Sequence, residues 1–537
     1  MMQPAALLIT RLLMTTSWVL VYVVALANSH PLTYGSAGAR PYPTKTYNLI
    51  SQTTYPPDHN TAPQSTAFLA TPPDSNSSLL SINSGSYSGL GPTDTLHLAD
   101  YLARVYLHHP VARQSELLVR IGLARVQEAR GAFDPRLNLN WAEKSSVDKL
   151  SYDMADAGFS WTTPIGVQAY GNWERNTGSS VNPYDITTPE GQWMAGVRIP
   201  ITREGWINRR RTDLQSARLF AESTLFDQQL MLNDLLHKAA KAFFEWETAH
   251  RQLRIYQEAL EISDTILSNV RTAWRLGERA AIDTTEASLQ RLTWLQKWQQ
   301  TQTKLIEYRF EAAYYLWDST HQLYLQSLPF VPFTDQFAAP PQLDSSLMSR
   351  WLQEHPQLAR QDLGIDRQKL EERWLASRLL PGIEWEMGRI QGLSPVDGSS
   401  PALQSMSRLQ VNLPLFLRSE RGALKARRAL IEQAEWDRLM TENSISLDLR
   451  SKWKQVGLLA RQIRDQKSLV DQTRSMLEAE KSRFDLGESN VFLLNQREVA
   501  LINAEIRETE LLLELLKNTL YQFALAGRME DYARALK

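Results

Sequence analysis

The second half of this chain repeats the pattern of its first half. His109-Pro110 precedes a helical pattern that ends before Pro135, and His355-Pro356 precedes a helical pattern that ends before Pro381. The same number of residues separates the two prolines in each half. One supersecondary unit therefore occurs twice, and the fold has to be built from two copies of that unit.

Alternating apolar and polar residues follow the second proline of each unit, over 137–141 and 383–387. A further alternating run ends each time in a proline, Pro200 or Pro414. This alternation is typical of strands with one apolar face. Residues 159–173 predict an additional hairpin, with Pro164-Ile165-Gly166 at its turn. We expect four to six strands per chain, and the segment at about 150–190 is either an enlarged loop or an added hairpin.

Long segments without glycine or proline follow the strands. One runs from Gly205 to Gly277, and its counterpart runs from Gly422 to Gly487 with Gly457 as the one interruption. Apolar residues recur at helical spacing, so each segment predicts a helix of about 100 Å. The breaker-free residues 278–328 and 488–526 predict returning helices. We expect two antiparallel coiled-coil pairs that reverse at the two glycines.

Composition excludes several classes of function. The 537 residues carry a formal net charge of −1, which does not indicate a nucleic-acid partner. The chain has no cysteine, so it has no disulfide, thiolate metal site or cysteine nucleophile. Its nine histidines lack a metal-binding spacing such as His-Glu-x-x-His, and it has no glycine-rich phosphate loop. We predict a protein that is not an enzyme and has no catalytic residue, cofactor or metal.

The N-terminus has the pattern of a secretory signal peptide over residues 1–27. Arg11 supplies positive charge, residues 12–24 are apolar, and Ala25-Leu26-Ala27 is a small-x-small cleavage site. An uncleaved anchor is the alternative, although the apolar run is short for a spanning helix. Residues 28–93 are rich in Ser, Thr and Pro and predict a disordered leader. Any other membrane span would have to be built from strands.

Four to six strands cannot close a transmembrane barrel alone, because bacterial single-chain barrels begin at about 8 strands. An open sheet edge is not stable in lipid. Either the strands form a soluble sheet, or several chains pool them. Three chains with four strands each would give a barrel of about 12 strands.

The ordered series of motifs resembles the TolC-like outer-membrane efflux proteins over residues 95–526. The resemblance implies a mainly α-helical fold with a β-barrel part: a long antiparallel coiled-coil tunnel in the periplasm and a 12-stranded outer-membrane barrel shared by a homotrimer. It implies an exit duct of a tripartite efflux or type I secretion system in a Gram-negative bacterium. A periplasmic adaptor and an inner-membrane transporter would be its partners, and small molecules or polypeptides would pass through it passively.

The resemblance also implies roles for particular residues. The glycine turns correspond to adaptor-docking tips, which assigns Arg275, Gly277, Glu278, Gly487 and Glu488 to docking. The family often has acidic residues six and nine positions after each glycine, and those of the second repeat can line the closed aperture. The aperture candidates here are Asp283 and Glu286 in the first repeat and Leu493 and Gln496 in the second. Arg279 and Ser489 stand two residues after the glycines, and the arginine departs from the family pattern.

Two hypotheses about the function remain, and the strand residues distinguish them. A channel needs the odd-numbered apolar strand residues to face lipid: Leu139, Trp193, Val197, Trp385 and Val411. An exported coiled-coil structural or adhesion protein without a pore needs them packed against helices. The domain boundaries expected are 1–27 signal peptide, 28–93 leader, 94–328 first repeat, 329–344 linker, 345–526 second repeat and 527–537 C-terminal tail.

Overall fold

The computed structural model of the protein describes residues 95–146, 149–182, 185–320, 322–323, 331–333, 345–392 and 403–536. All of the described residues belong to one compact unit, residues 76–537. The predicted signal peptide (1–27) and leader (28–93) lie outside the described residues. None of the helices in the described ranges carries an apolar stretch sufficient for a bilayer crossing.

The two repeats appear as the same order of elements, with an extra hairpin in the first. The first repeat contains α3 (Pro110–Arg130), β2 (Arg136–Ser146), β3 (Lys149–Thr162), β4 (Gln168–Thr177), β5 (Gln192–Pro200), α4 (Arg209–Arg275) and α5 (Ala281–Tyr314). The second contains α7 (Pro356–Ser377), β7 (Gly382–Gly392), β8 (Leu403–Asn412), α8 (Arg418–Asp485) and α9 (Val491–Leu525).

Each His-Pro pair begins a helix by the same local chemistry. The Nδ1 atom of His109 accepts a hydrogen bond from the Val111 amide at 3.2 Å, and His355 accepts one from Gln357 at 3.2 Å. Proline follows at the first helical position, where its missing N–H costs nothing and its fixed φ suits the helix. The histidines are therefore N-caps, which explains why the pair recurs.

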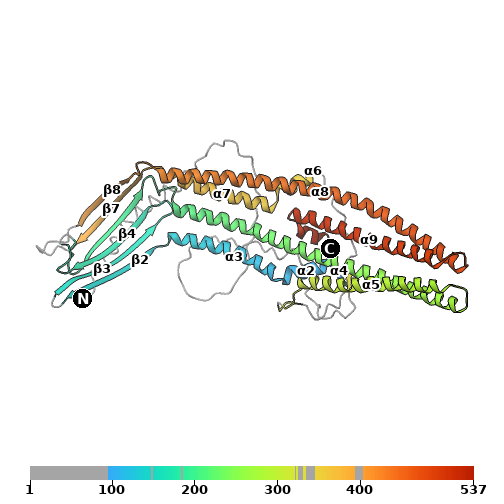
Figure 1. The fold of residues 1–537 in the computed structure, drawn as a ribbon. Helices are drawn as coiled ribbons and strands as arrows, with labels where there is room; N and C mark the ends of the chain where they lie inside the picture. Colours follow the sequence, from blue (N-terminus) through green and yellow to red (C-terminus); the bar gives the residue numbers. More distant parts are fainter. Residues whose placement is uncertain are drawn as a thin grey trace, which may run out of the picture. The chain divides into compact units, whose positions relative to one another are not determined.

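The long helices form the two predicted antiparallel pairs, α4 with α5 and α8 with α9 (Figure 1). Helices α4 and α8 contain 67 and 68 residues. Helix α5 ends at Tyr314, earlier than the breaker-free segment to Leu328 suggested. The Asp318 carboxylate accepts the amides of Thr320 and Gln322, both at 2.8 Å. This side-chain turn offers the backbone an alternative to the helix.

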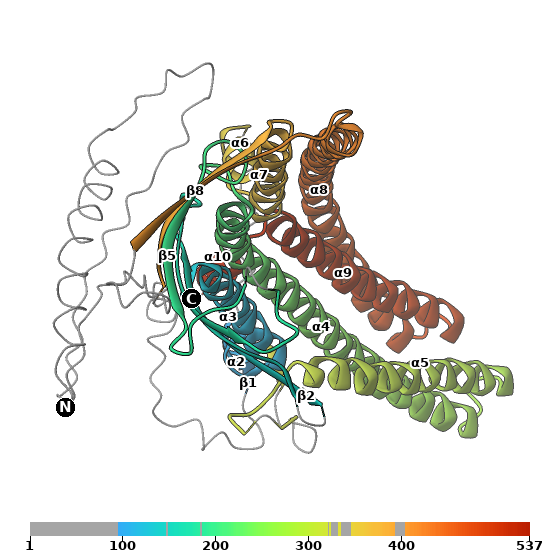
Figure 2. The same ribbon diagram turned by 90° about the vertical axis from the view of Figure 1, so that its left-hand side faces the viewer.

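Six strands form one antiparallel sheet in the order β2-β3-β4-β5-β7-β8. The sheet is curved (Figure 2). The predicted barrel of 12 strands assumed four strands per chain, and the structure corrects that number to six. The difference arises because the segment at about 150–190 contributes β3 and β4, which pair between β2 and β5 instead of forming a loop.

The turn between β3 and β4 is the predicted one. Gly166 has a φ of 86°, and its amide donates to the Thr163 carbonyl at 2.9 Å. A Cβ at Gly166 would lie 2.3 Å from the carbonyl oxygen of Glu204. Asn208, the N-cap of α4, donates to the Pro164 carbonyl at 3.0 Å and so fixes the turn beside the start of the helix.

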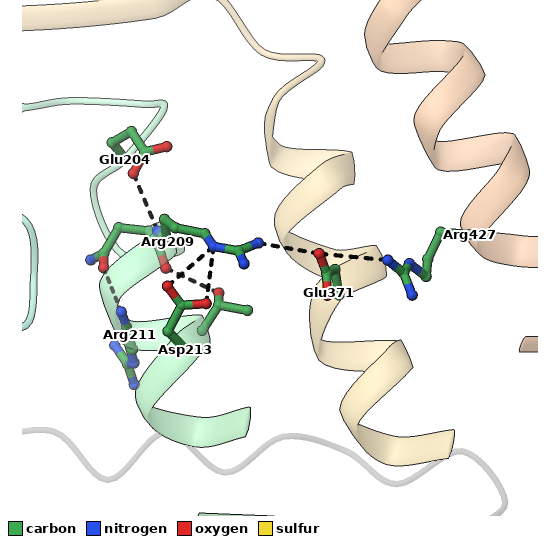
Figure 3. A network of polar contacts seen from close by, with 8 residues as sticks. Glu204, Arg209, Arg211, Asp213, Glu371 and Arg427 are labelled. Carbon is green, nitrogen blue, oxygen red and sulfur yellow. Dashed lines mark hydrogen bonds and ion pairs between the residues drawn. The ribbon is translucent and has the colours of Figure 1, made fainter. Parts of the chain in front are cut away.

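Charged side chains connect the helices just below the sheet. Arg209 of α4 donates to Glu371 of α7 at 3.2 Å, and Arg427 of α8 lies 3.6 Å from the same carboxylate (Figure 3). The guanidinium of Arg209 also lies 4.7 Å from the Trp374 ring. Elements from both repeats are therefore joined where the strands become helices.

The largest core cluster lies where α4 and α5 meet the shorter elements β1 (Thr95–His97), α2 (Leu98–His108) and α10 (Met529–Ala535). Residues 527–537, expected as a tail, contain α10, and its Met529 and Tyr532 are buried. Within the expected linker 329–344, β6 (Val331–Phe333) pairs with β1 in parallel. Helices η1 (Gly131–Phe133) and α6 (Ser345–Gln353) complete the described elements.

We predict that Asn208→Ala destabilises the protein more than the loss of an ordinary cap does. Asn208 is buried, accepts from the Arg211 amide at 2.8 Å and donates to Pro164 and Gly205. A lost cap costs about 1 kcal/mol, and carbonyls left without donors add about 1 kcal/mol or more. The measurement is thermal unfolding of the detergent-solubilised protein.

Asn490→Ala is the matched control, because Asn490 caps α9 from an exposed position and accepts one amide. Asn208→Asp separates the two roles, since it keeps the cap acceptor and removes the donors. Equal losses for Asn208→Ala and Asn490→Ala would show that the contact with the β3–β4 turn contributes nothing.

Candidate functional site

One face of the sheet is apolar and exposed. Side chains of register partners lie on the same face, and odd-numbered residues are partners of one another in every ladder, except beyond a bulge after Lys144, where Ser145 is opposite Leu150. On the edge strand β2, Leu137, Leu139 and Trp141 are each about 70% exposed, at 69%, 71% and 69%. Such a surface is unusual for a soluble protein and indicates a partner or a membrane.

The structure places all five residues that were expected to face lipid on this odd-numbered face. They come from four strands, and Val197 is half-buried while the others are exposed: Leu139, Trp193, Trp385 and Val411. None of these four is packed into a described helical core cluster.

The even-numbered face is polar and carries an ion-pair network that the sequence did not reveal. Arg198 lies 3.1 Å from Glu384 and 3.2 Å from Glu386, and Arg408 lies 3.5 Å from Glu386. Tyr170 lies across a glycine of the neighbouring strand, where a Cβ on Gly196 would approach its hydroxyl to 2.5 Å. The polar residues at even-numbered positions were visible in the sequence, but the ion-pair partners on neighbouring strands were not.

Exposed aromatic residues follow the last strand of each repeat. Trp206 is 69% exposed and has the Arg211 guanidinium 4.6 Å from its ring centre. Phe416 is 71% exposed and has Arg418 at 5.2 Å. Aromatic rings with a nearby cation suit the boundary between lipid and water. Both lie in the segment between the last strand of a repeat and its long helix, and sequence reasoning did not single them out.

The two helical tips have nearly identical backbones. Gly277 and Gly487 adopt φ values of 79° and 77°. In the first tip the Gly277 amide donates to Trp274 at 3.0 Å and the Glu278 amide to Ala273 at 2.9 Å. The second tip repeats both bonds at 3.1 and 2.9 Å. This is the Schellman arrangement, which needs a left-handed residue and therefore favours glycine.

The residues expected at the adaptor-docking tips are exposed: Arg275, Gly277, Glu278, Gly487 and Glu488. Four large apolar residues that were not singled out lie beside them. They are Leu276 at 70%, Ile282 at 69%, Leu486 at 75% and Phe492 at 52% exposure. Each tip therefore presents an apolar pair surrounded by charge, in the same relation to its glycine.

The atypical residue Arg279 connects the two tips. Its guanidinium donates to the Ser489 carbonyl at 3.3 Å and lies 4.4 Å from the centre of the Phe484 ring. The Ser489 hydroxyl in turn contacts the Glu480 carboxylate. The arginine of the first tip is therefore bound to the backbone of the equivalent position in the second tip.

The four aperture candidates lie in the first turns of α5 and α9. Asp283, Glu286 and Leu493 are partly exposed, and Gln496 is exposed. The Leu493 amide donates to the Asn490 cap at 2.8 Å. The structure does not bring these four side chains together within one chain into a ligand-binding group. In the described part of the chain, no group of three or more metal-ligating side chains could hold an ion.

Glu498 of α9 is a fully buried carboxyl in the helical region, and sequence reasoning missed it. Burial raises its pKa to about 7. The neighbouring Trp294 and Lys481 favour the charged form and offset only part of that effect. Glu498 stands four residues after Leu494 and three before Leu501, on the buried stripe of α9, and this spacing was the signal that sequence reasoning missed.

We predict that Glu498 makes the helical region less stable as pH rises from about 4.5 to about 7. In that window the folded carboxyl holds a proton that the unfolded chain has released, so stability falls with increasing pH. At about 1.4 kcal/mol per pKa unit, the penalty above pH 7 is about 3 kcal/mol. Thermal unfolding across this range should show the slope in the wild type and its loss in Glu498→Gln. Identical pH profiles for both proteins would contradict the prediction.

Comparison with known proteins gives structural matches. No protein-family model matches the chain, and no curated protein matches it in sequence. The outer-membrane channel OprN superposes with a TM-score of 0.60 at 15% identity, over 80% of this chain and 90% of OprN. CusC superposes with a TM-score of 0.60 at 12% sequence identity, over 82% of this chain and 95% of CusC. The outer membrane channel CmeC of Campylobacter jejuni superposes with a TM-score of 0.56 at 11% sequence identity, over 82% of this chain and 89% of CmeC.

These matches extend across both repeats and cover most of each known channel. Identity is low, so what they share with this chain is the arrangement of strands and helices. The chain therefore has the fold of the TolC-like outer-membrane channels, as its repeated motifs predicted.

Proposed function

We propose that this protein is the outer-membrane channel of a tripartite efflux or type I secretion system in a Gram-negative bacterium. It passes small molecules or polypeptides out of the cell passively. The observation that carries the proposal is the combination of a two-faced sheet with long helical pairs on a channel fold. The apolar face suits lipid, and the polar face suits an aqueous lumen.

A homotrimer provides the closure that one chain lacks. Strands β2 and β8 form the two edges of the described sheet, and neither edge has a partner among the described residues. Lipid offers no hydrogen bonds to such edges. Pairing β8 of one chain with β2 of the next satisfies both edges, and cyclic symmetry closes the ring.

The exposed rings of Trp206 and Phe416 support the same placement. They follow the last strands of the two repeats, where the chain leaves the sheet for the helices. In this arrangement they lie at the periplasmic surface of the membrane, and Arg211 and Arg418 reach the lipid headgroups. The helical pairs then extend into the periplasm.

The tips provide the docking surface for a periplasmic adaptor, which links the channel to an inner-membrane transporter. Exposed Leu276 and Leu486 supply apolar contact, and Arg275, Glu278 and Glu488 supply charge around it. Interfaces of this type are organised around buried apolar anchors within a polar rim. The transporter supplies the energy, and gating follows from movement of the tips that Arg279 holds together.

A coiled-coil structural protein without a pore is the competing function. It would require the odd-numbered strand residues to be packed against helices. Leu139, Trp193 and Val411 are 71%, 63% and 58% exposed instead. The sheet face therefore favours the channel.

The decisive experiment is planar-bilayer conductance of the detergent-extracted protein, with its oligomeric mass measured alongside. We expect a trimer with discrete conductance steps. Val197→Asp combined with Val411→Asp should prevent membrane assembly, because a charge facing lipid costs about 2–4 kcal/mol near the bilayer centre for Lys or Arg and somewhat less for Asp. Gln410→Asp is the control, since it adds a charge to the polar face of β8.

Normal insertion of the Val197/Val411 variant would refute the proposed lipid-facing surface. A water-soluble wild-type protein without conductance would refute the channel itself and leave the coiled-coil alternative.

We predict that Leu276→Asp with Leu486→Asp abolishes export without affecting trimers or conductance. The substitutions place charge in the apolar centre of the docking surface, and both leucine side chains are exposed in the chain, at 70% and 75%. Export in cells reports docking, and conductance of the purified trimer reports the pore. Gly487→Pro should act in the same way through the turn. Unimpaired export by the leucine variant would contradict the docking role.

A further inference from the structure

Strands β3 and β4 are paired on both sides over most of their length. The β2–β3 ladder runs from Arg136 opposite Ser160 to Ser146 opposite Lys149. The β4–β5 ladder runs from Gln168 opposite Arg198 to Glu174 opposite Gln192. This hairpin therefore occupies the middle of the sheet and separates β2 from β5.

Over residues 136–144 of β2, before the bulge that follows Lys144, the hairpin carries the apolar face across in one register. Leu139 is opposite Ala157, which is opposite Trp173, which is opposite Trp193. A slip of one residue in any of these ladders would send the apolar set to the other face. Over the part of the sheet nearer the helices, the four strands β2, β3, β4 and β5 thus share one apolar surface, and the Arg175–Asp153 ion pair, at 2.8 Å, lies on the same face farther out.

A second row of apolar residues runs across the sheet from the hairpin to β7. Trp161 is opposite Ala169, Ala169 is opposite Val197, and Val197 is opposite Met387. The row begins on β3 and ends on β7, in the second repeat. Any environment that covers Val197 therefore also covers Ala169 at the same level of the sheet.

The length of the hairpin and its turn suit a membrane wall. β3 has 14 residues and β4 has 10, compared with 11 in β2 and 9 in β5. A tilted membrane strand needs about 9–11 residues. The turn at Thr163–Val167 is held beside the start of α4 by the buried Asn208, so the hairpin returns at the helical end of the sheet.

From this geometry we propose that β3 and β4 are wall strands of the membrane barrel and not an extracellular loop. The inference rests on the proposed trimeric channel. Three chains with six strands each then close a barrel of 18 strands. Six is an even number, so β8 runs antiparallel to β2 of the next chain and the ring closes with the same pairing throughout.

Barrel diameter grows roughly linearly with strand number, so this barrel is about one and a half times as wide as one of 12 strands. Barrels of about 16–18 strands enclose an open aqueous channel. The membrane portion then admits whatever the helices pass, polypeptides included, and the helical part sets the size limit on cargo.

Single cysteine substitutions test whether β3 and β4 are wall strands. The chain has no cysteine of its own, so any labelled thiol is the introduced one. Ala169→Cys places a thiol on the apolar face of β4. Val197→Cys is the depth-matched control on β5, a wall strand whether or not the hairpin is in the membrane. Ser160→Cys reports the polar face of β3. A charged, membrane-impermeant maleimide is applied to trimers in outer-membrane vesicles, and the remaining thiols are counted after denaturation.

We expect the thiols of Ala169→Cys and Val197→Cys both to be protected from the maleimide, and the thiol of Ser160→Cys to be labelled. Labelled Ala169→Cys beside protected Val197→Cys would overturn the wall assignment and leave the channel intact. Labelling of both apolar-face cysteines would instead refute the channel proposal itself.

Imaging of wild-type trimers in nanodiscs is an independent test that needs no variant. A ring of 18 strands supports the proposal. A ring of 12 strands with β3 and β4 outside it overturns the proposal, even though such a protein would still be a channel.

Discussion

The sheet has two faces of opposite character and two edges without partners among the described residues, and the rest of the structure follows from that constraint. An exposed row of leucine and tryptophan on β2 is not stable in water, and the open backbone of β2 and β8 is not stable in lipid. The proposed trimer satisfies both requirements. The long helical pairs, the charged network below the sheet and the exposed tips are arranged around a structure that one chain leaves incomplete.

Local features were predictable from the sequence because short-range chemistry determines them. The His-Pro helix starts, the glycine reversals, the long helices and the odd-numbered strand faces all depend on residues within a few positions of one another. The end of α5 was misplaced because Asp318 terminates the helix through a side-chain turn without glycine or proline. The six-stranded sheet was not predictable, since a hairpin signal at Pro164-Ile165-Gly166 does not say which strands accept the hairpin as a neighbour.

Long-range contacts account for most of what was missed at the candidate site. Arg279 and Ser489 are 210 residues apart in sequence, and the hydrogen bond from the Arg279 guanidinium to the Ser489 carbonyl joins the two tips. Glu498 is buried only because helices from both repeats enclose it. A duplicated unit can therefore keep its backbone while its side chains diverge wherever the two copies meet.

The turn at Thr163–Val167 brings two strands into the sheet without bringing a helix with them. Every other strand that reaches the helical end of the sheet continues into a helix or begins after one. The number of strands in a chain is consequently independent of its number of helices. In the proposed channel, insertion or loss of one such hairpin during evolution changes the circumference of the pore and leaves the helical tunnel and its proposed docking tips the same.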